Sequence, residues 1–205
     1  MEQALFEQYE AAKEQGNKGL ATALIAKFIG TFSTDEERKE WTRWYMVNRT
    51  FGHAVRHELF EGVMFPVLLV GHQRSDPWCI EVLERCAQNL YKADHLWSQV
   101  GYQTEMQLAE RRLELIPNDP KAKTRLLEHL IAWFRYSEHE WPAGILYGAD
   151  GATEAQCQEI LMSIKKARTL DEGRAHLHYL NQFEAKVDQY IHRLRTSAGR
   201  PASNA

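Results

Sequence analysis

The chain has 205 residues, of which 44% are hydrophobic, 26% charged and 11% aromatic, and its formal net charge at pH 7 is −3. This length suits one full-sized domain, or at most two small ones, whose core needs no disulfide or metal. The composition excludes a disordered chain. The mildly acidic charge argues against duplex DNA or anionic membranes as partners, because both require a concentrated basic surface.

Helix signals recur along the whole chain, and no alternating strand pattern flanked by a tight-turn dipeptide occurs. In chain order, helices are expected at about 2–15, 18–31, 34–49, from Pro77 onward, and at 103–116, 120–136, 154–167 and 172–195. The predicted fold is all-α, an antiparallel helical bundle or irregular α-solenoid of about eight or nine helices. We expect a single all-helical domain over 1–195 and a flexible tail over 196–205.

Local signals mark two helix starts in the first half of the chain. Ser33 with Glu36 predicts a capping box, and Asp76 followed by Pro77 predicts an N-cap and a first helical residue. Between these starts, the stretch at 53–71 is mostly apolar, and its glycine and proline allow a break or kink.

Two groups of residues predict core packing. Trp41, Trp44 and Tyr45 fall on one helix face and the basic residues mostly on others, which favours a buried stripe over a nucleic-acid stacking platform. The chain has three cysteines and no CxxC pair. Cys79 and Cys86 are about 10 Å apart along one helix, too far to bridge, so we expect small core residues in a reducing compartment.

One junction resembles the tetratricopeptide repeat family. Residues 112–127, RLELIPNDPKAKTRLL, have the helix, proline, short polar turn and new helix of that family. The resemblance covers one repeat boundary. Arg112 stands where the family usually has a small residue, Leu127 stands where it usually has Gly or Ala, and no second copy follows at a period of about 34 residues. An irregular array is therefore expected rather than a regular one.

The last two helices carry clear signals of their own. Thr153 with Gln156 predicts the cap of the helix at 154–167. The final helix has an apolar seam at alternating steps of three and four, made by Leu180, Phe183, Val187, Tyr190 and Leu194. Such a seam faces either the core or a partner, so a homo-oligomer through the C-terminal helix is one expectation.

His53 and His57 form the pattern closest to metal chemistry, because their i,i+4 spacing places both on one helix face. A third ligand would come from His72, Asp94 or His139. The alternative is a partly buried histidine pair that caps or packs. The common nucleophile and nucleotide-binding motifs are missing from the sequence. We therefore expect no catalytic residue, no cofactor and no metal, and keep a metal- or cofactor-binding enzyme or sensor using these histidines as the second hypothesis.

Residues 135–148, RYSEHEWPAGILYG, concentrate residue types that binding sites use. Aromatic rings bury area at low entropic cost, charges orient a partner, and a long non-helical stretch often carries function. The expected partner-binding residues are Arg135, Tyr136, Glu138, His139, Glu140, Trp141 and Tyr147. In the alternative, Trp141, Ile145 and Leu146 fold back to seal the core, and the charges pair around the helix end.

These observations favour a non-enzymatic protein that binds another protein. Its most concrete version, reached by elimination, is an immunity protein that neutralises a bacterial toxin by occluding its active or binding surface. Acidic and aromatic residues would then cover a basic or aromatic-lined site on the toxin. We expect a cytoplasmic protein without nucleic-acid or membrane partners, because the N-terminus lacks a signal-peptide pattern and no apolar run approaches the roughly 20 residues that span a bilayer.

Overall fold

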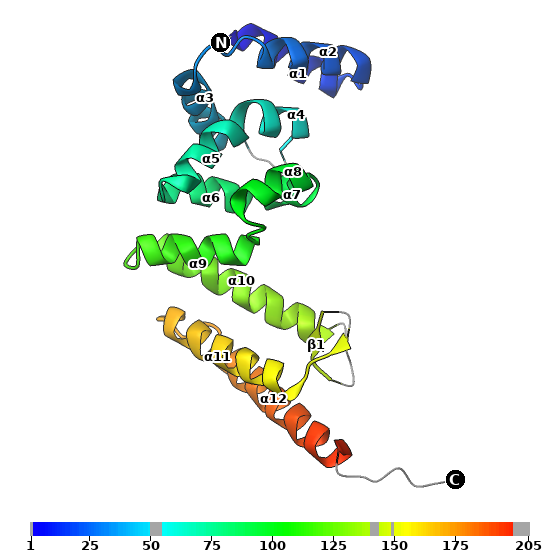
Figure 1. Ribbon diagram of the computed structural model, residues 1–205, viewed down its shortest axis with the longest axis vertical. Coiled ribbons are helices and arrows are strands. Elements are labelled where there is room, and N and C mark those ends of the chain that lie inside the picture. Colours follow the sequence, from blue (N-terminus) through cyan, green and yellow to red (C-terminus); the bar gives the residue numbers. More distant parts are fainter. Residues whose placement is uncertain (1, 50–54, 140–143, 149, 199–205) are drawn as a thin grey trace, which may run out of the picture. The chain divides into compact units, whose positions relative to one another are not determined.

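The computed structural model describes residues 2–49, 55–139, 144–148 and 150–198, and within them the fold is all-α, as predicted (Figure 1). The chain divides into two compact units, Met1–Ile116 and Pro117–Ala205. Whether the two units form the single domain predicted over 1–195 depends on how they associate, so that expectation stays a prediction. No helix in the described ranges is long and apolar enough to cross a membrane.

Short helices make up the first unit. They are α1 (Gln3–Glu14), α2 (Lys18–Ile29), α3 (Asp35–Asn48), α4 (His57–Leu59), the π-helix η1 (Phe60–Met64), α5 (Phe65–Gln73), α6 (Pro77–Arg85), α7 (Ala87–Tyr91), α8 (Asp94–Trp97), the 3-10 helix η2 (Ser98–Val100) and α9 (Glu105–Leu115). The second unit has longer helices, α10 (Pro120–His139), α11 (Glu154–Leu170) and α12 (Leu177–Ala198), with the strands β1 (Leu146–Tyr147) and β2 (Asp150–Gly151) between α10 and α11.

Helix α3 has a capping box, but one residue later than predicted. The Thr34 hydroxyl accepts a hydrogen bond from the Glu37 amide, and the Glu37 carboxylate accepts from the amides of Ser33 at 2.7 Å and Thr34 at 3.2 Å. The sequence STDEE contains the capping spacing twice, once from Ser33 to Glu36 and once from Thr34 to Glu37. Spacing alone could not choose between them.

The predicted aromatic stripe of α3 lies in the core of the first unit. Trp41 is 1% exposed, whereas Trp44 and Tyr45 are half-buried. Five rings surround Trp41 with centroids between 4.9 and 6.3 Å away, those of Phe6, Phe28, Phe32, Trp44 and Tyr45. The stripe therefore stabilises the packing of α1, α2 and α3 and offers no stacking platform.

The predicted break in the apolar stretch at 53–71 takes the form of the π-helix η1. A Cβ atom on Gly62 would lie 2.8 Å from Cγ2 of Ile29, so a glycine is required where this segment passes α2. Pro66, which has no amide to donate, is the second residue of α5 and follows directly after this π-helix. As expected, Asp76 caps α6 through the amides of Trp78 and Cys79.

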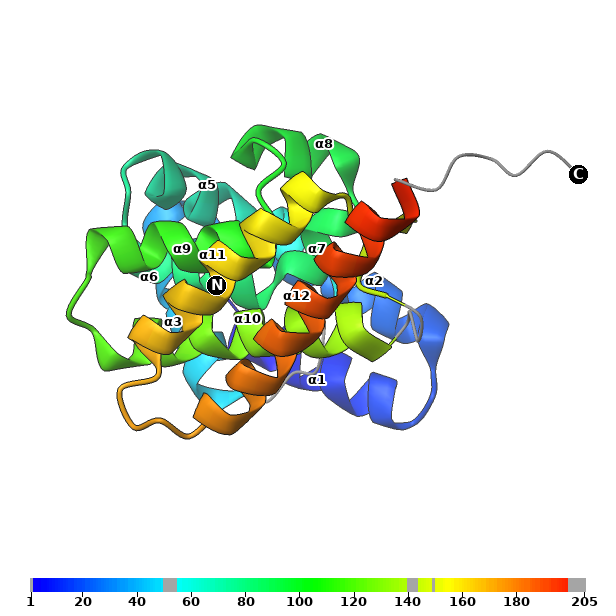
Figure 2. The same cartoon turned by 90° about the horizontal axis from the view of Figure 1, so that it is seen from below.

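The apolar seam of α12 is packed inside the second unit. Leu180, Phe183 and Val187 are fully buried, and the Phe183 ring lies 5.0 Å from that of Phe134 on α10. Helix α11 contacts both α10 and α12, as Figures 1 and 2 show. Because the seam forms core, it gives no reason to expect a homo-oligomer through this helix.

Helix α12 begins at Leu177, several residues after the predicted start at 172. The buried carboxylate of Asp171 explains this delay, because it accepts hydrogen bonds from the amides of Ala175 at 2.9 Å and His176 at 2.7 Å. Earlier in the chain, α9 ends at Leu115 and α10 begins at Pro120. These ends match the helix, turn and new helix predicted at 112–127. The tetratricopeptide resemblance itself stays a prediction.

Candidate functional site

The segment after α10 contains a short antiparallel hairpin where a stretch without regular structure was expected. Leu146 pairs with Gly151 and Tyr147 with Asp150, and Gly148 supplies a left-handed turn residue with φ of +67°. Ile145 and Leu146 are 2% and 9% exposed. Part of this segment therefore seals the core, as the alternative interpretation expected. Glu140 and Trp141 lie outside the described residues.

The predicted contact residues that the structure describes do not all lie in one patch. Arg135 and Glu138 lie on the flank of α10 that contacts α12, through Tyr179 and Lys186. Tyr136 is two residues before Glu138, about 200° around the helix, and is 58% exposed. His139 is also exposed.

Four residues form what we term the clasp between α10 and α12: Arg135, Glu138, Tyr179 and Lys186. The Arg135 guanidinium lies 5.5 Å above the Tyr179 ring, whose hydroxyl donates to Glu138 at 3.3 Å. Glu138 also pairs with Lys186. Burial raises the pKa of Tyr179, while the charge of Arg135 opposes that rise. The phenol thus stays protonated as a donor, and two predicted contact residues are occupied within the unit.

Tyr147 is held on the other side of α10. Its ring makes an edge contact with Trp133 at 6.2 Å, and its hydroxyl donates to Glu159 of α11 at 3.0 Å. The hydrogen bond to Glu159 is the main cause of the raised pKa of Tyr147. The residue is half-buried, so it anchors the hairpin on α10 and α11 and presents only part of its ring.

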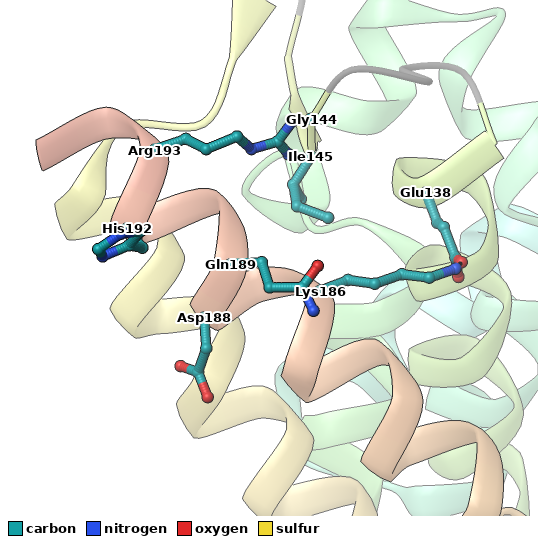
Figure 3. A pocket seen from close by; sticks show the side chains of 8 residues that line it. All are labelled: Glu138, Gly144, Ile145, Lys186, Asp188, Gln189, His192 and Arg193. Carbon is teal, nitrogen blue, oxygen red and sulfur yellow. Dashed lines mark hydrogen bonds and ion pairs between the residues drawn. The ribbon is translucent and has the colours of Figure 1, made fainter. Parts of the chain in front are cut away.

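Beside the clasp lies a pocket of about 800 Å³, shown in Figure 3. It lies between the end of α10, the backbone at Gly144 and Ile145, and one face of α12. The described residues that line it are Glu138, Gly144, Ile145, Lys186, Asp188, Gln189, His192 and Arg193. Lys186, Gln189 and Arg193 point toward the opposite wall, whereas Asp188 and His192 point away from it. The flank that faces the pocket therefore carries amide and cationic donors.

Two of these donors are unused inside the described chain. The Arg193 guanidinium lies 5.6 Å from the Tyr190 ring and pairs with no carboxylate of the described residues. The Gln189 amide likewise has no hydrogen-bond partner within those residues. The pocket can thus bind a polar group, and its described lining contains no serine, threonine or cysteine that could serve as a nucleophile.

Sequence reasoning missed Gln189 and Arg193 because they follow Glu138 by some fifty residues, and only folding brings them together. A weak signal was present. Lys186, Gln189 and Arg193 follow the i,i+3,i+7 spacing of one helix stripe, directly beside the apolar seam. Such a polar stripe is also typical of a solvent-exposed helix face, so its spacing alone does not mark a binding site.

The histidine hypothesis receives no support from the described residues. His57 pairs with Glu61 at 3.2 Å, and the second oxygen of Glu61 lies 2.7 Å from His95. Among the residues that the structure places, no three His, Cys, Asp or Glu side chains are grouped to hold a metal ion. His72 contacts Arg111 instead, and burial together with that positive charge lowers its pKa. His53 lies outside the described residues.

The three cysteines are free and buried, as expected of core residues. Burial raises the pKa of Cys79 to about 11 and that of Cys86 to about 12. Both thiols are therefore protonated at neutral pH and poorly suited to nucleophilic chemistry.

No protein family, curated protein or solved structure matches this chain in sequence or fold comparisons.

Proposed function

We propose that this chain is a non-enzymatic protein that binds another protein, and that the pocket beside the clasp is the centre of its contact surface. One observation carries the proposal. Gln189 and Arg193 face a large open pocket with donors that the described chain does not use. Exposed donors held on a rigid helix can orient a partner without reorganisation.

The lining of the pocket argues for a protein partner over a small molecule. Pockets for cofactors and other small molecules are mostly apolar and enclose their ligand. Among the eight lining residues that the structure describes, Ile145 is the one aliphatic side chain, and the others are charged, polar or glycine. Polar groups around a small apolar centre are typical of protein interfaces.

In this proposal the contact surface is narrower than the segment 135–148. Glu138 and Ile145 belong to it, whereas Tyr136 faces another side of α10 and Tyr147 packs against Trp133. Occlusion of a bacterial toxin remains the concrete form of the proposed function. A toxin-like reading frame beside the gene for this chain would support that form.

Filling the pocket tests the proposal. Gln189→Trp places a large ring in the pocket without changing charge, and Gln182→Trp places the same ring two helical turns earlier on the same face of α12, outside the lining. We expect affinity capture with quantitative mass spectrometry to recover a partner with the wild type and Gln182→Trp, and to lose it with Gln189→Trp. Retention by all three proteins, or no specific partner, overturns the proposal.

A further inference from the structure

Resting on the proposed function, we infer that the pocket recognises an acidic segment of the partner, with a carboxylate side chain bound by Arg193 and Gln189. Both side chains point from α12 toward Ile145 in Figure 3. The guanidinium of Arg193 offers a planar fork that matches a carboxylate, and the Gln189 amide supplies another donor. Ile145 lines the opposite wall but is only 2% exposed, so the recognition depends on the donors of α12.

The charges around the pocket favour an anionic guest over a cationic one. Glu138 already accepts from the Tyr179 hydroxyl and pairs with Lys186, so its carboxylate is not available to a lysine or arginine of a partner. Asp188 is directed away from the opposite wall. Of the charged lining residues, Arg193 alone faces the pocket without an opposite charge among the described residues.

The side chain of Arg193 is also held in one position. The guanidinium of Arg193 lies over the Tyr190 ring, which restricts the movement of the long side chain before any guest arrives. Tyr190 is buried in the seam of α12 and is itself fixed by packing. A donor with restricted freedom loses less conformational entropy on binding than a free surface arginine does.

The partner segment inferred here carries the opposite charge to the one expected from the sequence. The acidic residues of 135–148 suggested that the chain covers a basic site on its partner, but Glu138 is neutralised by Lys186. The net charge of the whole chain is −3. General electrostatics would therefore favour a basic guest, and binding of an acidic one must come from the local arrangement in the pocket.

Blocked hexapeptides of glutamate, glutamine and lysine test the inference by NMR titration of the ¹⁵N-labelled full-length chain. We expect the glutamate peptide to shift the Gln189 side-chain amide and the α12 backbone amides from 186 to 193. The glutamine and lysine peptides should leave these signals in place. Affinity for the glutamate peptide should fall as salt is added, because part of the attraction is between exposed charges.

Two arginine variants make the test specific. Arg193→Gln should weaken binding of the glutamate peptide about tenfold, the loss expected for one charge-assisted pair. Arg195→Gln removes the same charge two residues later, from an arginine that pairs with Glu154 and does not line the pocket, and should change affinity less than about twofold. Thermal unfolding of both variants shows that each is folded.

The inference is overturned if the lysine peptide shifts the pocket signals more than the glutamate peptide does, if no peptide shifts them, or if Arg193→Gln binds as the wild type does. Its failure is separate from that of the proposed function. If Gln189→Trp loses the partner but the wild type does not bind the glutamate peptide, the pocket is a contact site that recognises a different chemical group. If the wild type binds the glutamate peptide but Gln189→Trp retains the partner fully, the pocket binds acidic peptides and the captured partner binds elsewhere.

Discussion

Glu138 of α10, one of the predicted partner-binding residues, forms an ion pair with Lys186 of α12 inside the second unit. The same carboxylate accepts the hydroxyl of Tyr179. The charge of Glu138 on one side of the pocket is thereby paired, whereas Arg193 faces the pocket from the other side without a carboxylate partner among the described residues. The electrostatic character of the site is decided by this internal pairing.

Glu138→Gln should lower the free energy of unfolding by about 1 kcal/mol, because the ion pair with Lys186 and a charged hydrogen-bond acceptor for Tyr179 are lost together. Urea unfolding measures this difference. Glu128→Gln is a matched control on α10, since Glu128 pairs with Arg125 of the same helix on an exposed face and should cost less than about 0.5 kcal/mol. Equal effects of the two substitutions would mean that the clasp does not stabilise the unit.

Thr34→Ala should destabilise the protein by about 1 kcal/mol, since Thr34 caps α3 through the Glu37 amide. Ser33→Ala should change stability by less than about 0.5 kcal/mol, because only the backbone amide of Ser33 takes part in the cap. Thermal or urea unfolding distinguishes the two positions. A larger loss for Ser33→Ala would place the cap where the sequence first suggested.

Gly71→Ala should destabilise the first unit by about 1–3 kcal/mol through overpacking. A Cβ atom at this position would lie 2.1 Å from Sγ of Cys79, so α5 and α6 would have to separate. Gly19→Ala is the control in α2, where a Cβ atom would meet nothing within 4 Å. It should stabilise the protein by about 0.5 kcal/mol, since alanine is the better helix former. Gly71→Ala with wild-type stability would contradict this close contact.

Acid should weaken the second unit partly through Glu184 of α12. Two hydrogen bonds from the Arg168 guanidinium, at 2.5 and 3.1 Å, lower the pKa of Glu184 below its usual 4.5. The unfolded chain then binds this proton at a higher pH than the folded chain. The contribution is therefore complete above about pH 4.5 and is lost as pH falls through the folded pKa.

Urea unfolding between about pH 3 and 6 should show a shallower acid loss for Glu184→Gln than for the wild type. Arg168→Gln removes the partner and should flatten the profile in the same way. Parallel profiles for all three proteins would show that this pair adds nothing to the pH dependence. The effect should be smaller at high salt, because both side chains are 29% exposed and their charges are screened by solvent.

Local sequence signals predicted most helices because they act within one helical turn. Asp76 with Pro77, and Thr153 with Gln156, mark helix starts where the structure has them. The capping box was predicted one residue too early because Ser33 with Glu36 and Thr34 with Glu37 have the same spacing. The extended backbone at Thr34 makes this residue the N-cap. The hairpin at Leu146 was not predicted because each strand has only two residues, too few to show alternation, and its Asp-Gly dipeptide, Asp150 with Gly151, forms β2 and not the turn.

By itself, the sequence determined the all-α class, the burial of Trp41 and the cysteines, and the apolar seam of α12, because periodic apolar residues force one helix face into a core. Only the tertiary structure decided the pocket and its charge. Glu138 and Lys186 are 48 residues apart in the chain, and their pairing depends on how α10 and α12 pack around Phe134 and Phe183. Which charges neutralise one another is a property of that packing, since no local pattern records it.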